Sequence, residues 1–182
     1  MPRAAIVSLS FVMVALLAIV VYAGRREVTQ RAAATTMAAG VAAPAQPRAL
    51  SPEEEAYATA LWPTHNEVVE AAAVRLAFAG LVYATDDHDK GKLAATLRPV
   101  NATFHAALEK VRSLDVPASL QAVHEQYLES LTLYERASAE MLKVAEDGND
   151  RHLIDAEVMS HHAAQDLLKA GDVLWPGEHK PN

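Results

Sequence analysis

The sequence has no cysteine, and this absence excludes several kinds of chemistry at once. Without thiols the chain forms no disulfides and no thiolate metal sites, and it carries neither thioester-linked lipid nor covalently attached c-type haem. The absence does not indicate whether the protein works in a reducing or an oxidising compartment.

Basic charge is also scarce, because 16 Lys and Arg residues stand against 23 Asp and Glu residues and leave a net charge of −7. Nucleic-acid binding requires Lys and Arg clustered on one surface. The residues after the first fifty show no such cluster, so the composition argues against nucleic acid as a partner. The acidic excess favours solubility.

Motifs of catalysis are missing as well. The chain has no Gly-x-Ser-x-Gly nucleophile turn and no Gly-rich phosphate loop. Haem held without covalent links needs two axial ligands, Met and His or two His, that face each other at the same level of a bundle. Met141 and Met159 have only His152 and His161 in their region, which is a poor match. We therefore expect no enzymatic activity and no cofactor.

What the chain does contain is an uncharged apolar run, Ala4–Tyr22. About 20 apolar residues at a rise of 1.5 Å cross a hydrocarbon core of roughly 30 Å. Residues 1–24 are therefore predicted to form a transmembrane anchor helix in contact with the lipid bilayer. The run has no histidine and no charge, so it cannot bind a metal or relay protons. The role left for the run is to pack against other transmembrane helices. Ala4 and Ser8 are small residues four positions apart, a spacing that favours such a helix–helix contact.

A cleaved signal peptide is the alternative interpretation of this run. Arg3 gives a basic start, and Val21 and Ala23 are small residues at the positions that a signal peptidase inspects. The apolar run is longer than that of a typical signal peptide, which favours an uncleaved anchor.

The orientation of the anchor rests on two opposing signals. Arg25, Arg26 and Arg31 follow the run, and by the positive-inside rule they favour a cytoplasmic C-terminal domain. The signal-like start and the Ala- and Pro-rich stretch 25–50, a predicted stalk, favour an extracytoplasmic one. We expect a single-pass protein of the inner membrane whose C-terminal domain lies in the periplasm.

Residues 51–176 predict an all-α domain with four main helices. Ser51-Pro52 begins a short helix, Pro52–Leu61, which Pro63 interrupts. The main helices are then expected at His65–Ala84, from the turn at 86–89 to Leu114, at 117–147 and at 150–175. Short connections between them favour an antiparallel up-down-up-down four-helix bundle.

Apolar residues at the helical period predict the face that each helix buries. The stripes are Val68, Ala72, Leu76, Ala79 and Tyr83; Leu93, Leu97, Val100, Phe104, Leu108 and Val111; Leu120, His124, Tyr127, Leu131, Tyr134 and Met141; and Ile154, Val158, His161, Gln165 and Leu168.

The two tryptophans of the chain occupy equivalent corners. Leu61-Trp62-Pro63 precedes the first main helix, and Leu174-Trp175-Pro176 follows the last one. In an up-down-up-down bundle these corners lie side by side at the end that faces the membrane. Two interpretations stay open: the indoles close the bottom of the core, or, with the tail 177–182, they dock on a partner.

Eight histidines raise the question of a metal site. Counting the helical rise from the stalk end places Glu70, His105 and His124 at similar heights, with Glu109 one turn from His105. These four are the candidate ligands. The Glu-x-x-His pairs of di-iron bundles are absent, and pairs at i,i+4 also stabilise ordinary helices, so a structural role is the stronger interpretation.

Two functions follow as hypotheses. The first is a non-enzymatic accessory or scaffold subunit of a larger membrane complex, for example a photosynthetic or respiratory one, with other membrane-protein subunits as partners. The second is a free-standing anchored bundle that binds a small ligand or a divalent metal. Architecture alone does not choose between them.

Overall fold

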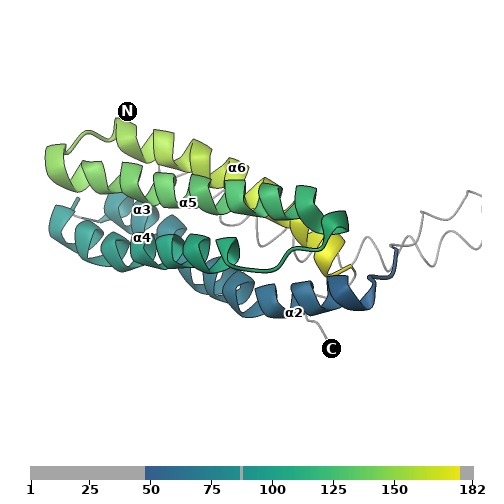
Figure 1. Cartoon of the computed structure of the whole chain (residues 1–182). Coiled ribbons are helices and arrows are strands. Elements are labelled where there is room, and N and C mark those ends of the chain that lie inside the picture. Colours follow the sequence, from purple (N-terminus) through teal and green to yellow (C-terminus); the bar gives the residue numbers. More distant parts are fainter. Residues whose placement is uncertain (1–47, 87, 177–182) are drawn as a thin grey trace, which may run out of the picture.

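The computed structural model describes residues 48–86 and 88–176, except for the side chains of Val69 and Glu70. All regular structure in this described part is helical, as the sequence predicts, and it contains four main helices and no strand (Figure 1). The predicted anchor 1–24, the predicted stalk up to residue 47 and the tail 177–182 lie outside the described residues.

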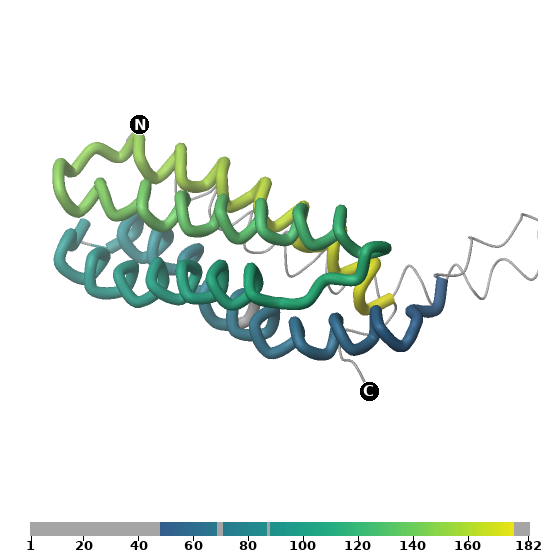
Figure 2. Tube along the Cα trace, in the orientation of Figure 1, coloured from purple at the N-terminus to yellow at the C-terminus, as the bar shows by residue number. Residues whose placement is uncertain are grey.

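The first helix is longer than predicted. It comprises α2 (Pro52–Asn66), a π-helical stretch η2 (Glu67–Ala73) and α3 (Val74–Thr85), and its path is followed in Figure 2. The predicted break at Pro63 is wrong, because Pro63 lies inside α2. A proline in a helix costs about 3 kcal/mol. Around it Leu61, Thr64 and Val68 are buried, and this burial keeps the helix continuous.

The other helices begin and end near the predicted residues. Helix α4 is Lys90–Arg112, and the carboxylate of Asp89 accepts a 3.0 Å hydrogen bond from the Lys92 backbone N–H as its N-cap. A 3-10 turn η3 (Ala118–Leu120) leads into α5 (Gln121–Asp147). Gly148 ends α5 with a φ of 74°, a conformation that glycine adopts without strain. Helix α6 is Arg151–Leu174.

Packing follows the order of the helices along the chain. Helix α4 packs on α5 and α5 on α6, each pair running in opposite directions (Figure 1). The first helix packs on α4 through η2 and α3, and its α2 end also contacts α6. Within the described residues α3 scarcely contacts α6, so α3 and α6 are the two ends of a row of helices. The stripes predicted for the first three main helices are all buried.

The stripe predicted for the last helix is wrong. Ile154, Val158 and Leu168 are 42%, 47% and 45% exposed. Helix α6 instead buries Leu153, Ala156, Ala163, Leu167, Ala170 and Leu174.

The reason is the close approach of α5 and α6, which make the most extensive contact between any two helices of the described part. Small residues on both helices are fully buried, with Ser130 and Ala137 on α5 and Ala156, Ala163 and Ala170 on α6 each 0% exposed. Small side chains let two helix axes come closer than bulky ones do. Ile154, Val158 and Leu168 lie on the other side of α6 and are therefore turned outward.

Among the described residues, one helix is long and apolar enough to cross a membrane by length and composition. It is the continuous first helix, Pro52–Thr85, whose most apolar window has a mean hydropathy of 1.5 and is 44% buried. Its hydropathy is high because it carries apolar residues on two sides. One side is the buried stripe, and the other holds the exposed Val74, Phe78 and Val82.

The close packing of α5 and α6 predicts that larger side chains between these two helices destabilise the fold. The substitution Ala163→Leu should lower the free energy of unfolding by about 1–3 kcal/mol, since a well-packed core does not admit extra methylene groups. The control Ala139→Leu, at an exposed position of α5, should change it by less than about 0.5 kcal/mol. Urea unfolding of the full chain in mild detergent, followed by circular dichroism, measures both. Equal effects of the two substitutions would contradict the α5–α6 packing described above.

Candidate functional site

The two Leu-Trp-Pro sequences, one inside α2 and one at the end of α6, meet near one end of the described helices. The ring centroids of Trp62 and Trp175 are 5.0 Å apart in an edge-to-face arrangement, and the His65 ring lies 5.6 Å from Trp62 and 4.4 Å from Trp175. Trp175 is 4% exposed and belongs to the core, whereas Trp62 is only partly buried. Trp175 thus closes the core, and Trp62 is the indole of the two that keeps an exposed part. The other predicted docking residues, Ala4 and Ser8, lie outside the described residues.

Two tyrosine–histidine pairs lie beside these indoles. The Tyr57 hydroxyl is 2.8 Å from Nδ1 of His124, and the Tyr127 hydroxyl is 3.2 Å from Nδ1 of His65. Burial raises the pKa of Tyr57 to about 12 and raises the pKa of Tyr127 above its usual range. Burial also lowers the pKa of His124, so the hydrogen bond of the first pair joins a neutral phenol and a neutral imidazole. The pairs join the first helix to α5 and satisfy polar groups that would otherwise be costly to bury.

A buried carboxylate at the start of α2 adds a third connection at this end. Glu54 is 1% exposed. Its oxygens accept hydrogen bonds from the Arg48 guanidinium at 2.6 and 2.9 Å, from the Ser51 backbone N–H at 2.7 Å and from the Ser119 hydroxyl at 2.7 Å. Arg48 and then the other donors hold the pKa of this carboxyl well below its usual range. The sequence predicted that a helix begins at Ser51-Pro52, but not that Glu54 contacts the turn before α5.

The predicted metal residues do not converge among the described side chains. Nδ1 of His105 is 2.7 Å from a carboxylate oxygen of Glu135 on α5, whereas Glu109 pairs with Arg112 at 2.6 Å. Nδ1 of His124 is hydrogen-bonded to the Tyr57 hydroxyl, and the Glu70 side chain lies outside the described residues. In the part of the chain that the structure describes, no group of three His, Asp or Glu side chains is placed to hold a metal ion.

Two outward apolar stripes are the most unusual surface feature of the described helices. The α3 stripe consists of Val74, Phe78 and Val82, which are 45%, 51% and 48% exposed. The α6 stripe consists of Ile154, Val158, Leu168 and Val173, which are 42–47% exposed. Scattered exposed apolar residues are normal, but Val74, Phe78 and Val82 follow one another at helical spacing, and so do Ile154 and Val158. The two stripes lie on the two helices that end the row.

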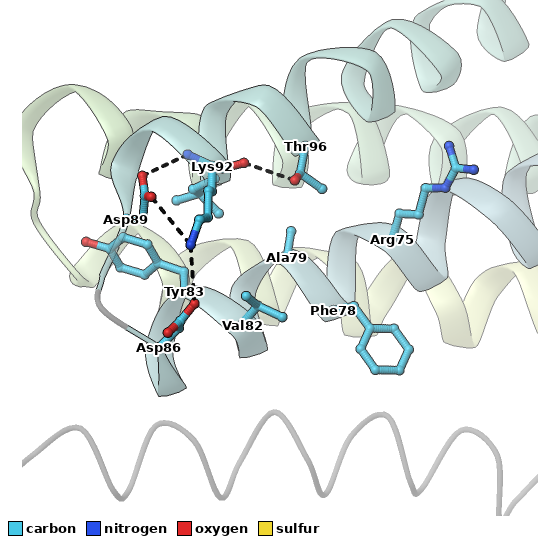
Figure 3. Close-up of a pocket in the computed structure, with 10 residues that line it drawn as sticks. Arg75, Phe78, Ala79, Val82, Tyr83, Asp86, Asp89, Lys92 and Thr96 are labelled. Carbon is cyan, nitrogen blue, oxygen red and sulfur yellow. Dashed lines mark hydrogen bonds and ion pairs between the residues drawn. The ribbon is translucent and has the colours of Figure 1, made fainter.

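A shallow hollow of about 170 Å³ borders the α3 stripe (Figure 3). Phe78, Val82 and Leu93 line it from α3 and α4. At one end Lys92 Nζ lies 3.7 Å from carboxylate oxygens of both Asp86 and Asp89, so these charges are paired with one another. The hollow extends the apolar surface of α3 and brings no cluster of unpaired polar groups to a ligand.

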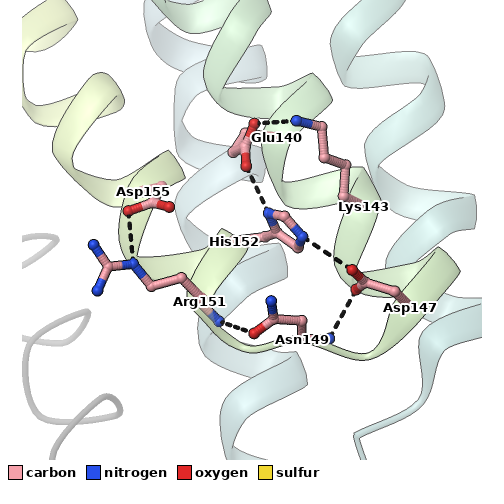
Figure 4. A network of polar contacts seen from close by, with 7 residues as sticks. All are labelled: Glu140, Lys143, Asp147, Asn149, Arg151, His152 and Asp155. Atoms are coloured by element: carbon pink, nitrogen blue, oxygen red, sulfur yellow. Dashed lines mark hydrogen bonds and ion pairs between the residues drawn. The ribbon is translucent and has the colours of Figure 1, made fainter.

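A polar network holds the opposite end, where α5 turns into α6 (Figure 4). Nδ1 of His152 is 2.6 Å from a carboxylate oxygen of Glu140, and Nε2 is 3.1 Å from one of Asp147. The hydrogen bond to Glu140, and then that to Asp147, raise the pKa of His152. Lys143 donates to Glu140 at 2.6 Å. The sequence analysis missed this network, although the spacing of these residues around the predicted turn could have indicated it.

The His152 network predicts a pH-dependent stability. A histidine whose pKa is raised by folding contributes stability that is fully present below the unfolded-state pKa of about 6.5 and is lost as the pH rises through the folded-state pKa. Donors to Glu140 and Asp147, chiefly Lys143 and the Asn149 N–H, lower the pKa values of these carboxyls, so both stay ionised in this window.

The substitution His152→Gln should therefore lower the free energy of unfolding more at about pH 5.5 than at about pH 9. Urea unfolding at the two pH values measures this difference. An NMR titration of the Glu140→Gln variant serves as a control, because the pKa of His152 should fall toward its ordinary value there. The same loss of stability at both pH values would show that the ion pairs do not act as described.

No known protein family, no curated protein and no solved structure matches this chain. Its function is therefore inferred from its own residues and surfaces.

Proposed function

We propose that this chain is a non-enzymatic accessory subunit of a larger membrane complex. Residues 1–24 anchor it in the inner membrane, residues 25–50 form a stalk, and residues 51–176 form an antiparallel four-helix bundle on the periplasmic side. Its partners are other membrane-protein subunits, a photosynthetic or respiratory assembly being one candidate. The chain scaffolds that complex and carries out no reaction of its own.

The observation that carries this proposal is the pair of outward apolar stripes. Seven large apolar residues that are each more than two-fifths exposed lie on α3 and α6. Exposed apolar surface of this kind, bordered by polar residues, is typical of protein–protein contacts. Helices α3 and α6 also end the row of packed helices, so each has one side without a helical neighbour in the described part. A helix of a partner subunit could pack along that side.

The rest of the described surface supports a binding role. The polar side chains that sequence patterns single out are mostly engaged in pairs that join helices, such as Tyr57 with His124 and His152 with Glu140. These pairs hold the helices in place at both ends. A rigid helical platform that presents an apolar strip suits a scaffold, since little ordering is needed when a partner binds.

The proposal predicts what co-purifies with the chain. In mild detergent the full chain should elute with other subunits, well above its own mass of 19.6 kDa. The double substitution Phe78→Glu with Val158→Glu should weaken this association by roughly thirtyfold or more, since losing a central apolar contact costs about 2 kcal/mol. The double control Ala106→Glu with Ala139→Glu adds the same charge at exposed positions of α4 and α5 and should leave the association intact.

Both variants should remain in the membrane fraction, because the predicted anchor is unchanged. A chain that elutes alone at its own mass in mild detergent would overturn the proposal. Loss of partners in the control as well would show that the α3 and α6 stripes are not the contact.

A further inference from the structure

We propose that the α3 and α6 stripes have an occupant within the same chain: the apolar segment Ala4–Tyr22, whenever that segment is outside a bilayer. In this state the segment packs as a fifth helix along α3 and α6 and completes the row of helices. Insertion of the segment into the membrane removes it and frees the stripes. The inference rests on the proposed function, because the partner subunit would bind the surface that is freed.

The dimensions of the two surfaces agree. The α6 stripe runs from Ile154 to Val173, which is about 28 Å at the helical rise of 1.5 Å per residue. The segment Ala4–Tyr22, as a helix, is also about 28 Å long. A helix of this length therefore matches the α6 stripe from end to end and exceeds the shorter α3 stripe.

The chemistry of the two surfaces also agrees. The segment has no charged residue and no histidine, so its docking buries no unpaired charge. On α6 the polar residues between Val158 and Leu168 include His161 and Gln165, whose side chains bond to each other at 2.9 Å. That bond uses one nitrogen of each side chain, and their other polar atoms reach water where the covering helix leaves them exposed. The stripes and the segment thus share one requirement, which is removal of apolar surface from water.

The tether permits the contact. The described chain begins at Arg48, which binds Glu54 at the start of α2. Residues 23–47 reach roughly 80 Å when fully extended, whereas α6, with its 24 residues, is about 36 Å long. The segment can lie along α6 in either direction. A connection of this length keeps the segment at an effective concentration on the order of millimolar, which favours docking within one chain over pairing of two dilute chains.

A bilayer covers more of the apolar surface of the segment Ala4–Tyr22 than the stripes do. The stripes cover one side of the apolar helix, whereas lipid surrounds it on all sides. The segment therefore leaves the stripes when a membrane is available and covers them when it is not. By this competition the surface for a partner is exposed only on chains that are anchored.

Cross-linking tests this inference, and the absence of native cysteine makes the test specific. The full chain carries Val14→Cys, in the middle of the segment, together with Val158→Cys in the α6 stripe. The matched control pairs Val14→Cys with Ala106→Cys, an exposed position on α4. Each chain is made by cell-free synthesis at low concentration, either without lipid or with phosphatidylcholine vesicles, and is treated with a short bifunctional maleimide. Circular dichroism checks that both chains are helical.

The expected result is a cross-link within one chain for the Val158 pair without lipid, at least about tenfold above that of the control pair and above that of the same chain in vesicles. Cross-linked dimers would overturn the inference in favour of a second copy as the occupant. Equal cross-linking of the control pair, equal cross-linking in vesicles or no cross-linking would also overturn it. Co-purification of partner subunits from membranes is measured separately, so the inference can fail while the proposed function stands.

Discussion

The close contact between α5 and α6 is the interaction on which the rest of this structure depends. Ser130 and Ala137 on one helix and Ala156, Ala163 and Ala170 on the other are fully buried, and their small size lets the two helices approach closely. This contact sets the rotation of α6 about its own axis. Once that rotation is set, Ile154, Val158 and Leu168 point outward, and the surface that we propose as functional exists.

Polar pairs at both ends hold the row of helices around this contact. At one end Tyr57 and Tyr127 bond to histidines on the facing helices, and the Trp62 and Trp175 rings pack edge to face. At the other end His152 connects Glu140 with Asp147 across the turn between α5 and α6. Burial or charge shifts the pKa values of several of these groups, but their partners are structural ones. The titratable residues named here thus connect helices and contribute to stability.

The arrangement of the helices as a row explains why apolar residues remain exposed. A helix in the middle of the row, such as α5, buries a broad face against two neighbours, whereas α3 and α6 each lack one neighbour in the described part. In the described part the first helix meets α6 chiefly through its α2 end. An apolar side chain on the uncovered side of α3 or α6 therefore stays in water unless another helix covers it, and exposure of this kind carries a free-energy cost that binding removes.

The sequence by itself determined that the described chain is all-helical, where most helices begin and end, and which faces of the first three main helices are buried. These features are local, since Asp89 caps its own helix, Gly148 ends its own, and the apolar residues of α4 and α5 recur at the helical period on one face. Tertiary structure alone decided the rest. Helix α6 has two stripes of helical period, one of large residues and one rich in alanine, and periodicity cannot choose between them. Only the small side chains facing it on α5 make the alanine side the better fit, just as burial around Pro63 keeps a helix continuous that local rules would break.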